Sequence, residues 1–156
     1  MAIRNIFVEG DEVLRKKAKI VDEITPKVIE LIDDMRETMT AANGVGIAAP
    51  QVGILKRVII VHHDPEDEST YYEFINPEIL LQEGTQEGTE GCLSLPGYVG
   101  MVERPYTVKM KAMDREGITK EYLFEGFPAV VVCHEIDHLN GVLYKDKATD
   151  YHKMDE

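Results

Sequence analysis

The stretch with the most obvious chemistry is "CHEIDHLNG", residues 133–141, which places a thiol, two imidazoles and two carboxylates in an otherwise apolar segment. His134 and His138 are four residues apart, so on a helix they lie about 40° apart around the axis and one turn apart along it. Both rings can therefore bind one metal ion. Glu135 is rotated by about 100° from His134, so its carboxylate can reach a water on that ion without being a ligand itself. This is the arrangement that H-E-x-x-H supplies for hydrolysis, and the alternative is a pair of hydrogen-bonded histidines in an ordinary helix.

A hydrolytic site of this kind needs a third protein ligand and one open coordination position. In one class of metalloproteases the pattern continues to a third histidine, but here Tyr144 occupies that place. In another class the ligand is a glutamate further downstream, and the sequence ends too soon after His138 for that spacing. Downstream substitutes would come from a polar tail that we expect to be loose: Asp146, Asp150 and His152. The best candidate lies upstream and is a cysteine.

The two cysteines are expected to differ in role. Cys92 lies in "EGCLSLPG", where glycine and proline indicate a tight turn or an irregular strand that could bring the thiol to the helix. A Cys/His/His set with an open position suits a soft-to-borderline divalent metal, and the alternative for Cys92 is an inert buried thiol. Cys133 is adjacent to His134 and faces another side of the helix, which predicts a small buried apolar residue. With no export signal, a thiol or metal role outweighs a disulfide.

Two helices are predicted to frame this chemistry. In "ITPKVIELIDDMRETMTAANG", Thr25 is the expected N-cap and Pro26 the first helical residue, and one apolar stripe consists of Val28, Leu31, Ile32, Met35 and Met39. The segment "GFPAVVVCHEIDHLNG" could be a strand on composition, but Pro128 near its start, Gly141 just past its end and its length favour a helix. Because that helix is apolar on nearly every side, it belongs in the core.

The remaining segments predict mainly antiparallel strands. Residues 57–63 read as a buried strand, "YYEFINPEILL" as strand, bend and strand, and residues 106–113 and 120–124 as arms of a hairpin. Asp11 is expected to cap a short helix through Ala18, residues 44–53 to form a shaped loop, and the chain after Tyr144 to fray. The predicted fold is α+β, with antiparallel strands around a central buried helix, in one domain spanning residues 1–156.

Composition and charge limit the class of protein and its expected location. The chain has 156 residues, 44% of them hydrophobic and 29% charged, which is typical of a globular protein of about one domain. Neither a secretory signal nor a membrane-spanning run is recognised, so we expect a cytoplasmic protein with no membrane partner. The net charge of −12 argues against direct nucleic-acid binding.

Three segments together carry a family resemblance. "GVGIAAPQ" (residues 44–51), "EGCLSLP" (90–96) and "HEIDHLNG" (134–141) resemble, in order and spacing, the three signature motifs of peptide deformylase. The resemblance implies the deformylase fold and a hydrolase that removes the formyl group from the N-terminal formyl-methionine of new polypeptides, releasing formate. It implies one divalent metal per chain, Fe²⁺ natively and Zn²⁺, Ni²⁺ or Co²⁺ in purified protein, with water as the fourth ligand. The protein ligands carried over by position are Cys92, His134 and His138.

The same resemblance assigns the other site residues. Glu135 would be the general base and then pass the proton to the leaving amine. The side-chain amide of Gln51 and the backbone N–H of Leu93 would stabilise the oxyanion, although Gln51 read alone is a turn residue after Pro50. The substrate backbone would pair with Val45 and Gly46, and Gly91 would also bind substrate. The methionine side chain would enter an apolar hole lined by Val130 and Val131, with Phe127 at its edge. An ion pair between Asp137 and Arg104 would fix the helix.

Two departures limit the resemblance. After "LSLP" the chain reads "GYVGMV", without the arginine that some deformylases place near the substrate. The tail "KATDYHKMDE" is short and acidic, so docking on the ribosome through a basic C-terminal helix does not carry over. The expected partners are nascent formyl-methionyl polypeptides, with transient ribosome contact, and the expected state is a monomer. The alternatives are a metallopeptidase that uses the same helix and a structural metal or binding module.

Overall fold

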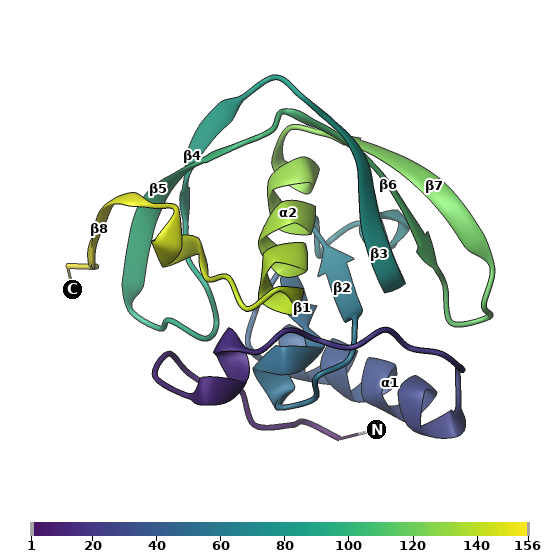
Figure 1. Ribbon diagram of the computed structural model, residues 1–156. Coiled ribbons are helices and arrows are strands. Elements are labelled where there is room, and N and C mark those ends of the chain that lie inside the picture. The colour runs from purple at the N-terminus through teal and green to yellow at the C-terminus, as the bar shows by residue number, and fades with distance from the viewer. Residues whose placement is uncertain (1, 156) are drawn as a thin grey trace.

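The computed structural model describes residues 2–155 and places one helix between two antiparallel sheets (Figure 1). The larger sheet has the order β1-β2-β3-β6-β7, with bounds Gly46–Ala48, Val58–His62, Tyr71–Glu83, Thr107–Met113 and Thr119–Glu125. The smaller sheet has the order β4-β5-β8, with bounds Gln86–Glu90, Tyr98–Arg104 and Thr149–Lys153. The helix between them is α2, Phe127–Leu139, so the predicted α+β arrangement is confirmed.

Helix α1, Pro26–Ala41, lies on the outer side of β1 and β2 (Figure 1). Thr25 caps it by accepting a hydrogen bond from the Val28 N–H at 3.4 Å, and Pro26 is its first residue, as predicted. The predicted apolar stripe is buried against residues of both strands, among them Ile47 and Ile60. The helical spacing of the apolar residues and the Thr25 N-cap therefore account for the position and the buried face of α1.

Helix α2 is buried because almost all of its faces are apolar. Its residues Val132, Cys133 and Ile136 pack in one cluster with side chains of the larger sheet, including Phe74. The helix ends where Gly141 adopts a φ of +74°, and a Cβ at that position would lie 2.5 Å from the Arg15 carbonyl oxygen. Glycine is thus required at the end of α2 by both conformation and space.

The predicted hairpin is confirmed as β6 and β7, with Val108, Met110 and Ala112 buried on the inner face. The bend expected within "YYEFINPEILL" is a register shift inside the single strand β3, between Ile75 and Glu78. Asn76, at this shift, has a φ of +52°. The sheet therefore continues through a β-bulge rather than ending at Pro77.

The N-terminal region differs from its prediction. Asp11 caps only the short 3-10 helix η1, Glu12–Arg15, and the expected helix through Ala18 is wrong. After η1 the backbone is extended, because the Ala18 N–H donates a hydrogen bond to the Leu139 carbonyl at 2.8 Å and Lys19 forms a β-bridge with Lys56. The loop expected over residues 44–53 instead contains β1 and the 3-10 helix η2, Ala49–Val52. A further 3-10 helix, η3, spans Glu68–Thr70.

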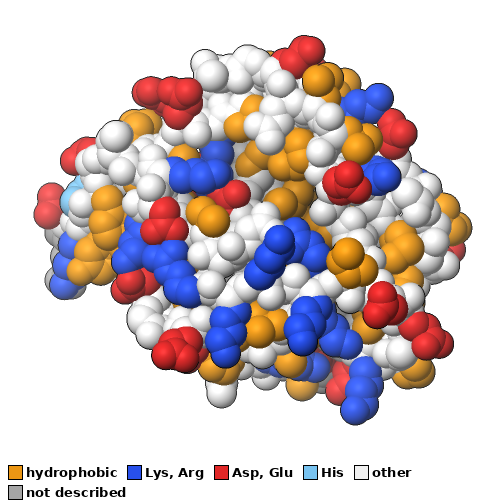
Figure 2. All heavy atoms as spheres, viewed as in Figure 1, with side chains coloured by type: hydrophobic (Ala, Val, Ile, Leu, Met, Phe, Trp, Pro, Cys, Tyr) orange, Lys and Arg blue, Asp and Glu red, His pale blue; other side chains and the backbone are white. Residues whose placement is uncertain are grey.

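The C-terminal region is ordered by tertiary contacts, and the expectation of fraying after Tyr144 is wrong. This region forms the 3-10 helix η4, Tyr144–Asp146, and the strand β8, which pairs with β5. The Tyr151 ring stacks on Tyr98 with centroids 5.2 Å apart. Among residues 2–155, no helix has the length and apolar character needed to cross a membrane. Lys and Arg side chains gather over the lower part of the face in Figure 2, so the net negative charge is unevenly spread.

Candidate metal centre and active site

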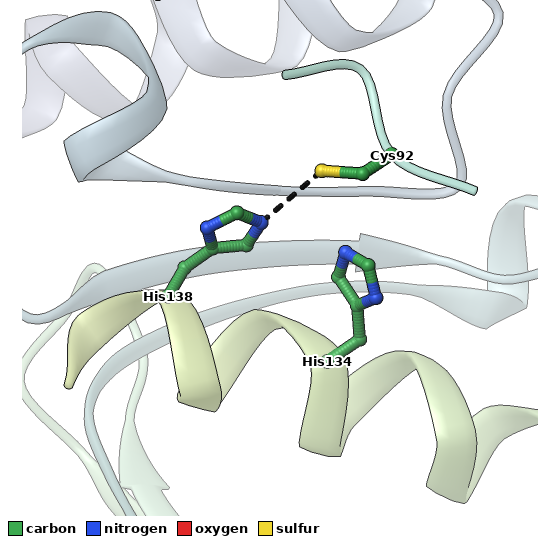
Figure 3. A group of neighbouring side chains, drawn as sticks. All are labelled: Cys92, His134 and His138. Atoms are coloured by element: carbon green, nitrogen blue, oxygen red, sulfur yellow. Dashed lines mark hydrogen bonds between the residues drawn. The ribbon is translucent and has the colours of Figure 1, made fainter. Parts of the chain in front are cut away.

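Cys92, His134 and His138 converge on one point (Figure 3). One potential ligand atom from each residue lies within 4.8 Å of the others, and Cys92 Sγ is 3.3 Å from His138 Nε2. Helix α2 presents the two imidazoles one turn apart, and the thiol comes from the segment between β4 and β5. There the Leu95 N–H donates to the Cys92 carbonyl at 3.0 Å, which closes a turn and aims the thiol at the helix.

A buried ionic network lies behind His134. Glu90 Oε1 is 2.9 Å from His134 Nδ1, and the guanidinium of Arg104 donates two hydrogen bonds of 2.8 Å to the Glu90 carboxylate. The third contact of Arg104 is to Asp137 Oδ2 at 2.7 Å. Burial alone would raise the pKa of Glu90, but its bonds to Arg104 and His134 hold it at about 2. Glu90 is therefore a carboxylate that fixes the His134 ring through Nδ1 and leaves Nε2 available.

The Glu135 carboxylate lies beside this cluster and is only 4% exposed as a residue. Its Oε1 has no hydrogen-bond partner among the described residues. Burial raises the pKa of Glu135 to about 7, against the opposing effect of His134. The β1 backbone approaches closely, because a Cβ on Gly46 would lie 2.6 Å from Glu135 Oε2. A carboxyl group in this environment is suited to accepting and returning a proton near neutral pH.

Gln51 is held with its amide nitrogen toward the thiol. Its Oε1 accepts a hydrogen bond from the Ala48 N–H at 2.9 Å, which fixes the side chain within η2. Its Nε2 lies 3.0 Å from Ser94 Oγ and 3.6 Å from Cys92 Sγ. Leu93 follows Cys92 in the turn, and its N–H is not used by the hydrogen bond that closes that turn.

A cavity of about 400 Å³ opens beside the cluster. Most of the site residues expected from the sequence line it: Val45, Gly46, Gln51, Gly91, Cys92, Leu93, Phe127, Val130, Val131, His134 and Glu135. His138 lies behind them, and burial lowers its pKa well below the ordinary value. Cys133 faces away into the core, where burial raises its pKa to about 11, as expected of a thiol without a chemical role.

The donor set fits a divalent metal ion. A thiol and two imidazoles at mutual distances under 4.8 Å match the ligands and spread of a soft-to-borderline metal site. Burial disfavours a charge on His134, yet its interactions with Cys92 and Glu90 raise its pKa to about 10. The carboxylate on the far nitrogen of a ligating histidine is the usual second contact in such sites.

Several residues near the centre were not predicted. Glu90 is buried and begins the quoted "EGCLSLP" segment, so its place two residues before Cys92 was the only signal in the sequence. Ser94 positions Gln51, and the Tyr144 ring stacks on His134 with centroids 5.8 Å apart. Tyr98 and Met154 line the cavity from the smaller sheet and from the tail that was expected to fray. No local pattern marks these last contacts, because they depend on β5–β8 pairing.

The family model for polypeptide deformylase matches residues 3–154. This chain belongs to the polypeptide deformylase family. It is 52% identical to the peptide deformylase of Lachnoclostridium phytofermentans, over 94% of this chain and 90% of that protein. Its fold is similar to an actinonin complex of a peptide deformylase from Synechococcus elongatus, with a TM-score of 0.91 and 39% identity, covering 94% of this chain and 81% of that one. The fold is also similar to a Met-Ala-Ser-bound peptide deformylase from Acinetobacter baumannii, with a TM-score of 0.89 and 41% identity. That match covers 94% of this chain and 100% of the other.

Membership of the deformylase family decides between the alternatives left open by the helix motif. The protein is a metalloenzyme that removes the N-formyl group from the N-terminal formyl-methionine of newly made polypeptides. The metallopeptidase and the purely structural metal module are therefore set aside. The family resemblance, the α+β fold and the hydrolase activity inferred from three sequence motifs are confirmed.

Proposed function

We propose that Cys92, His134 and His138 bind one divalent metal ion per chain, with Fe²⁺ as the native ion and Zn²⁺, Ni²⁺ or Co²⁺ as replacements in purified protein. The convergence of their ligand atoms within 4.8 Å is the observation that carries this assignment. Such an ion would lower the pKa of water toward about 7 and polarise the formyl carbonyl. Divalent metals compete for sites of this type, so occupancy depends on supply.

Glu135 is assigned the proton transfers. Glu135 lines the cavity next to the ligands, and its buried Oε1 has no hydrogen-bond partner among residues 2–155. As water attacks the formyl carbon, Glu135 takes the proton that water releases. The carboxyl group then gives that proton to the amide nitrogen as the C–N bond breaks, leaving formate and a free amine.

The charge that develops on the formyl oxygen needs hydrogen-bond donors already in place. We assign this role to the Nε2 group of Gln51 and the backbone N–H of Leu93. The fixed orientation of the Gln51 amide supports this, because its oxygen is occupied by the Ala48 N–H and only the nitrogen can face the site. Donors that are held before reaction cost no reorganisation when the charge appears.

The cavity supplies a site for the peptide itself. Val45, Gly46 and Gly91 are proposed to pair with an extended substrate backbone, in the manner of an added strand. Phe127, Val130 and Val131 are proposed to surround the methionine side chain, and all six residues line the same cavity. The ion pair of Asp137 with Arg104 is assigned a structural role, since Arg104 also holds Glu90 against His134.

The proposed substrate also indicates where the protein acts and which partners it meets. We infer that residues 1–156 act as one catalytic domain and as a monomer in the cytoplasm, where nascent formyl-methionyl chains are made. Contact with the ribosome would be transient, with neither a membrane partner nor direct nucleic-acid recognition. The net charge of −12 supports the last point.

Two substitutions test the residue assignments. Cys92→Ala should lose stoichiometric metal and release no formate from formyl-Met-Ala-Ser, whereas Cys133→Ala, a matched loss of the other thiol, should keep both. Glu135→Gln should retain the metal but lower kcat by at least about 100-fold, within the usual range for a positioned acid–base group. Metal is measured after anaerobic purification and formate by a coupled assay. A metal-loaded, active Cys92→Ala enzyme would refute the ligand set, and undiminished turnover by Glu135→Gln would refute the general base.

A further inference from the structure

Basic side chains without an ion-pair partner gather on one part of the molecule. Within residues 2–155, the lysines and arginines that form no ion pair with a carboxylate are Lys153 and a group between residues 16 and 57: Lys16, Lys17, Lys19, Lys27, Lys56 and Arg57. Figure 2 shows Lys and Arg side chains over the lower part of one face, where Figure 1 places α1 and the N-terminal segment. On a chain of net charge −12, this local excess of positive charge indicates a surface that is complementary to an anionic partner.

Two of these lysines line a cavity that is distinct from the proposed active site. Its volume is about 300 Å³, and it shares none of its described lining residues with the cavity beside Cys92. The lining combines three aliphatic side chains with three cations and one carboxylate: Val28, Leu31, Ile54, Arg4, Lys27, Lys56 and Glu30. This volume is at the lower end for a binding pocket, so the cavity suits a single side chain or a small ligand.

The backbone and one ion pair hold these cations around the cavity. Lys19 and Lys56 form a parallel β-bridge, so the positive charge extends from the cavity along the neighbouring strand. Arg4 Nε donates to Asp34 Oδ2 at 2.8 Å, and the Arg4 N–H donates to Thr38 Oγ1 at 2.9 Å. The two terminal nitrogens of the guanidinium donate to no other group of the described chain, so they are available to a ligand. Donors that are positioned before binding lower the entropic cost of binding.

The combination of aliphatic wall and cations favours an acidic peptide over other anions. Val28 and Leu31 are buried and Ile54 is half-buried, so a leucine or isoleucine side chain in the cavity would be withdrawn from water. Carboxylates beside that side chain would lie near Lys27 and Lys56. No aromatic side chain of residues 2–155 lines the cavity, so it offers no stacking surface for nucleic-acid bases, and the net charge of −12 repels an extended phosphate backbone.

We propose that this basic cavity is a docking site for an acidic segment of a partner protein, in which one aliphatic side chain enters the cavity between flanking carboxylates. The docking site goes beyond deformylation and depends on neither the metal nor the proposed catalytic residues. Because the two cavities share no lining residue of the described chain, a docked segment leaves the residues of the catalytic cavity unoccupied. Glu30 is exposed at the cavity and opposes an acidic ligand, so its removal should strengthen docking.

The test measures binding of fluorescein-labelled peptides to the full chain by fluorescence anisotropy at low ionic strength. The peptides are acetyl-Asp-Glu-Leu-Asp-Glu amide, the same peptide with glycine in place of leucine, and a neutral peptide, acetyl-Asn-Gln-Leu-Asn-Gln amide. We expect the acidic leucine peptide to bind and the glycine peptide to bind about tenfold more weakly, the lower end for burial of a leucine side chain. The neutral peptide should also bind at least about tenfold more weakly, and added salt should weaken binding of the acidic peptides because it screens exposed charges.

Charge substitutions locate the binding. Lys27→Glu and Lys56→Glu change exposed side chains and should each lower the affinity for the acidic leucine peptide by about tenfold, whereas Glu30→Gln should raise it by about twofold. The matched control is Lys153→Glu, which makes the same change in net charge at an exposed lysine on β8 and should leave the affinity unchanged. Formate release should be unchanged in the Lys27, Lys56 and Glu30 variants, which shows that their fold and catalytic site are intact.

Three results would overturn the docking site: no binding of the acidic leucine peptide, an equal loss of affinity in the Lys153→Glu control, or tighter binding of a labelled oligouridylate of similar length. The last result would assign the basic face to a phosphate backbone instead. Absence of formate release by the unmodified enzyme would overturn the proposed function alone, because peptide docking is measured without turnover.

Discussion

Replacing Arg104 with methionine tests whether the buried network behind His134 holds the metal centre together. The Arg104 side chain is 2% exposed and bonds Glu90 twice at 2.8 Å and Asp137 once at 2.7 Å. Methionine keeps much of the volume but leaves the Glu90 carboxylate buried without its cation. Removing one partner of a buried ion pair costs about 3–5 kcal/mol. At about 2–4 °C per kcal/mol for a chain of this length, Tm should fall by roughly 6–20 °C.

The measurement is thermal unfolding of the wild type and the variant, once with chelator and once with one equivalent of Zn²⁺, alongside a competition assay for Zn²⁺ affinity. Arg115→Met is the matched control. Arg115 also bonds two carboxylates, Glu73 and Asp33 at 2.7 Å each, but it is 35% exposed. Solvent screening reduces that contribution to about 1 kcal/mol or less. Zn²⁺ affinity should drop by about 10–100-fold for Arg104→Met only, because Glu90 no longer orients His134 firmly.

Equal destabilisation by the two arginine substitutions would refute the reasoning, since burial would then make no difference. A double variant sharpens the test. Adding Glu90→Gln to Arg104→Met removes the stranded charge, so the double variant should regain part of the lost stability, and its effect should differ from the sum of the single effects by at least about 1 kcal/mol. Additive effects would show that Glu90 and Arg104 do not act as a pair.

Two further predictions concern the elements that flank the site. Asp34 accepts hydrogen bonds from the Ala2 N–H and Arg4 Nε at 2.7 and 2.8 Å, and these overcome burial to hold its pKa below the ordinary value. Because a lowered folded-state pKa stabilises only above the unfolded value of about 3.9, Asp34→Asn should cost about 1–3 kcal/mol in urea unfolding at pH 7, and the difference should shrink as the pH falls below about 4. Gly46→Ala should lower kcat for formate release by about 100-fold with the metal retained, because its Cβ would meet Glu135 Oε2 at 2.6 Å; a kcat within threefold of wild type would contradict this.

The helices could be predicted because their signals are local. Thr25 and Pro26 mark the start of α1, and Gly141 marks the end of α2, each within one turn of the element it bounds. Local hydrogen bonds and conformational preferences set these boundaries, so a short window of sequence contains them. The hairpin of β6 and β7 is recognisable for the same reason, from alternation and a four-residue turn segment, "DREG".

The missed features depend on contacts that are distant in sequence. The tail after Tyr144 is polar and looks unstructured alone, yet β8 is ordered by pairing with β5 some fifty residues earlier, a separation seen in Val99 opposite His152. Likewise Ala18 is drawn out of a helix by the Leu139 carbonyl at the end of α2. A propensity argument cannot weigh such partners, because tertiary pairing overrides weak local preferences.

The buried polar groups of α2 are tolerated because one sheet packs against the apolar faces of the helix and the other provides hydrogen-bond partners. The larger sheet packs against its apolar faces, with Phe74 beside Val132 in the same cluster. The smaller sheet and its turns bring polar partners to the remaining face: Glu90 to His134, Cys92 to His138, and Arg104 to Asp137. Each buried polar group of the helix motif except Glu135 Oε1 and His138 Nδ1 thereby gains a partner among the described side chains. Glu135 lines the cavity, so the carboxylate of the helix motif that lacks a hydrogen-bond partner at Oε1 is the one that the proposed chemistry needs free.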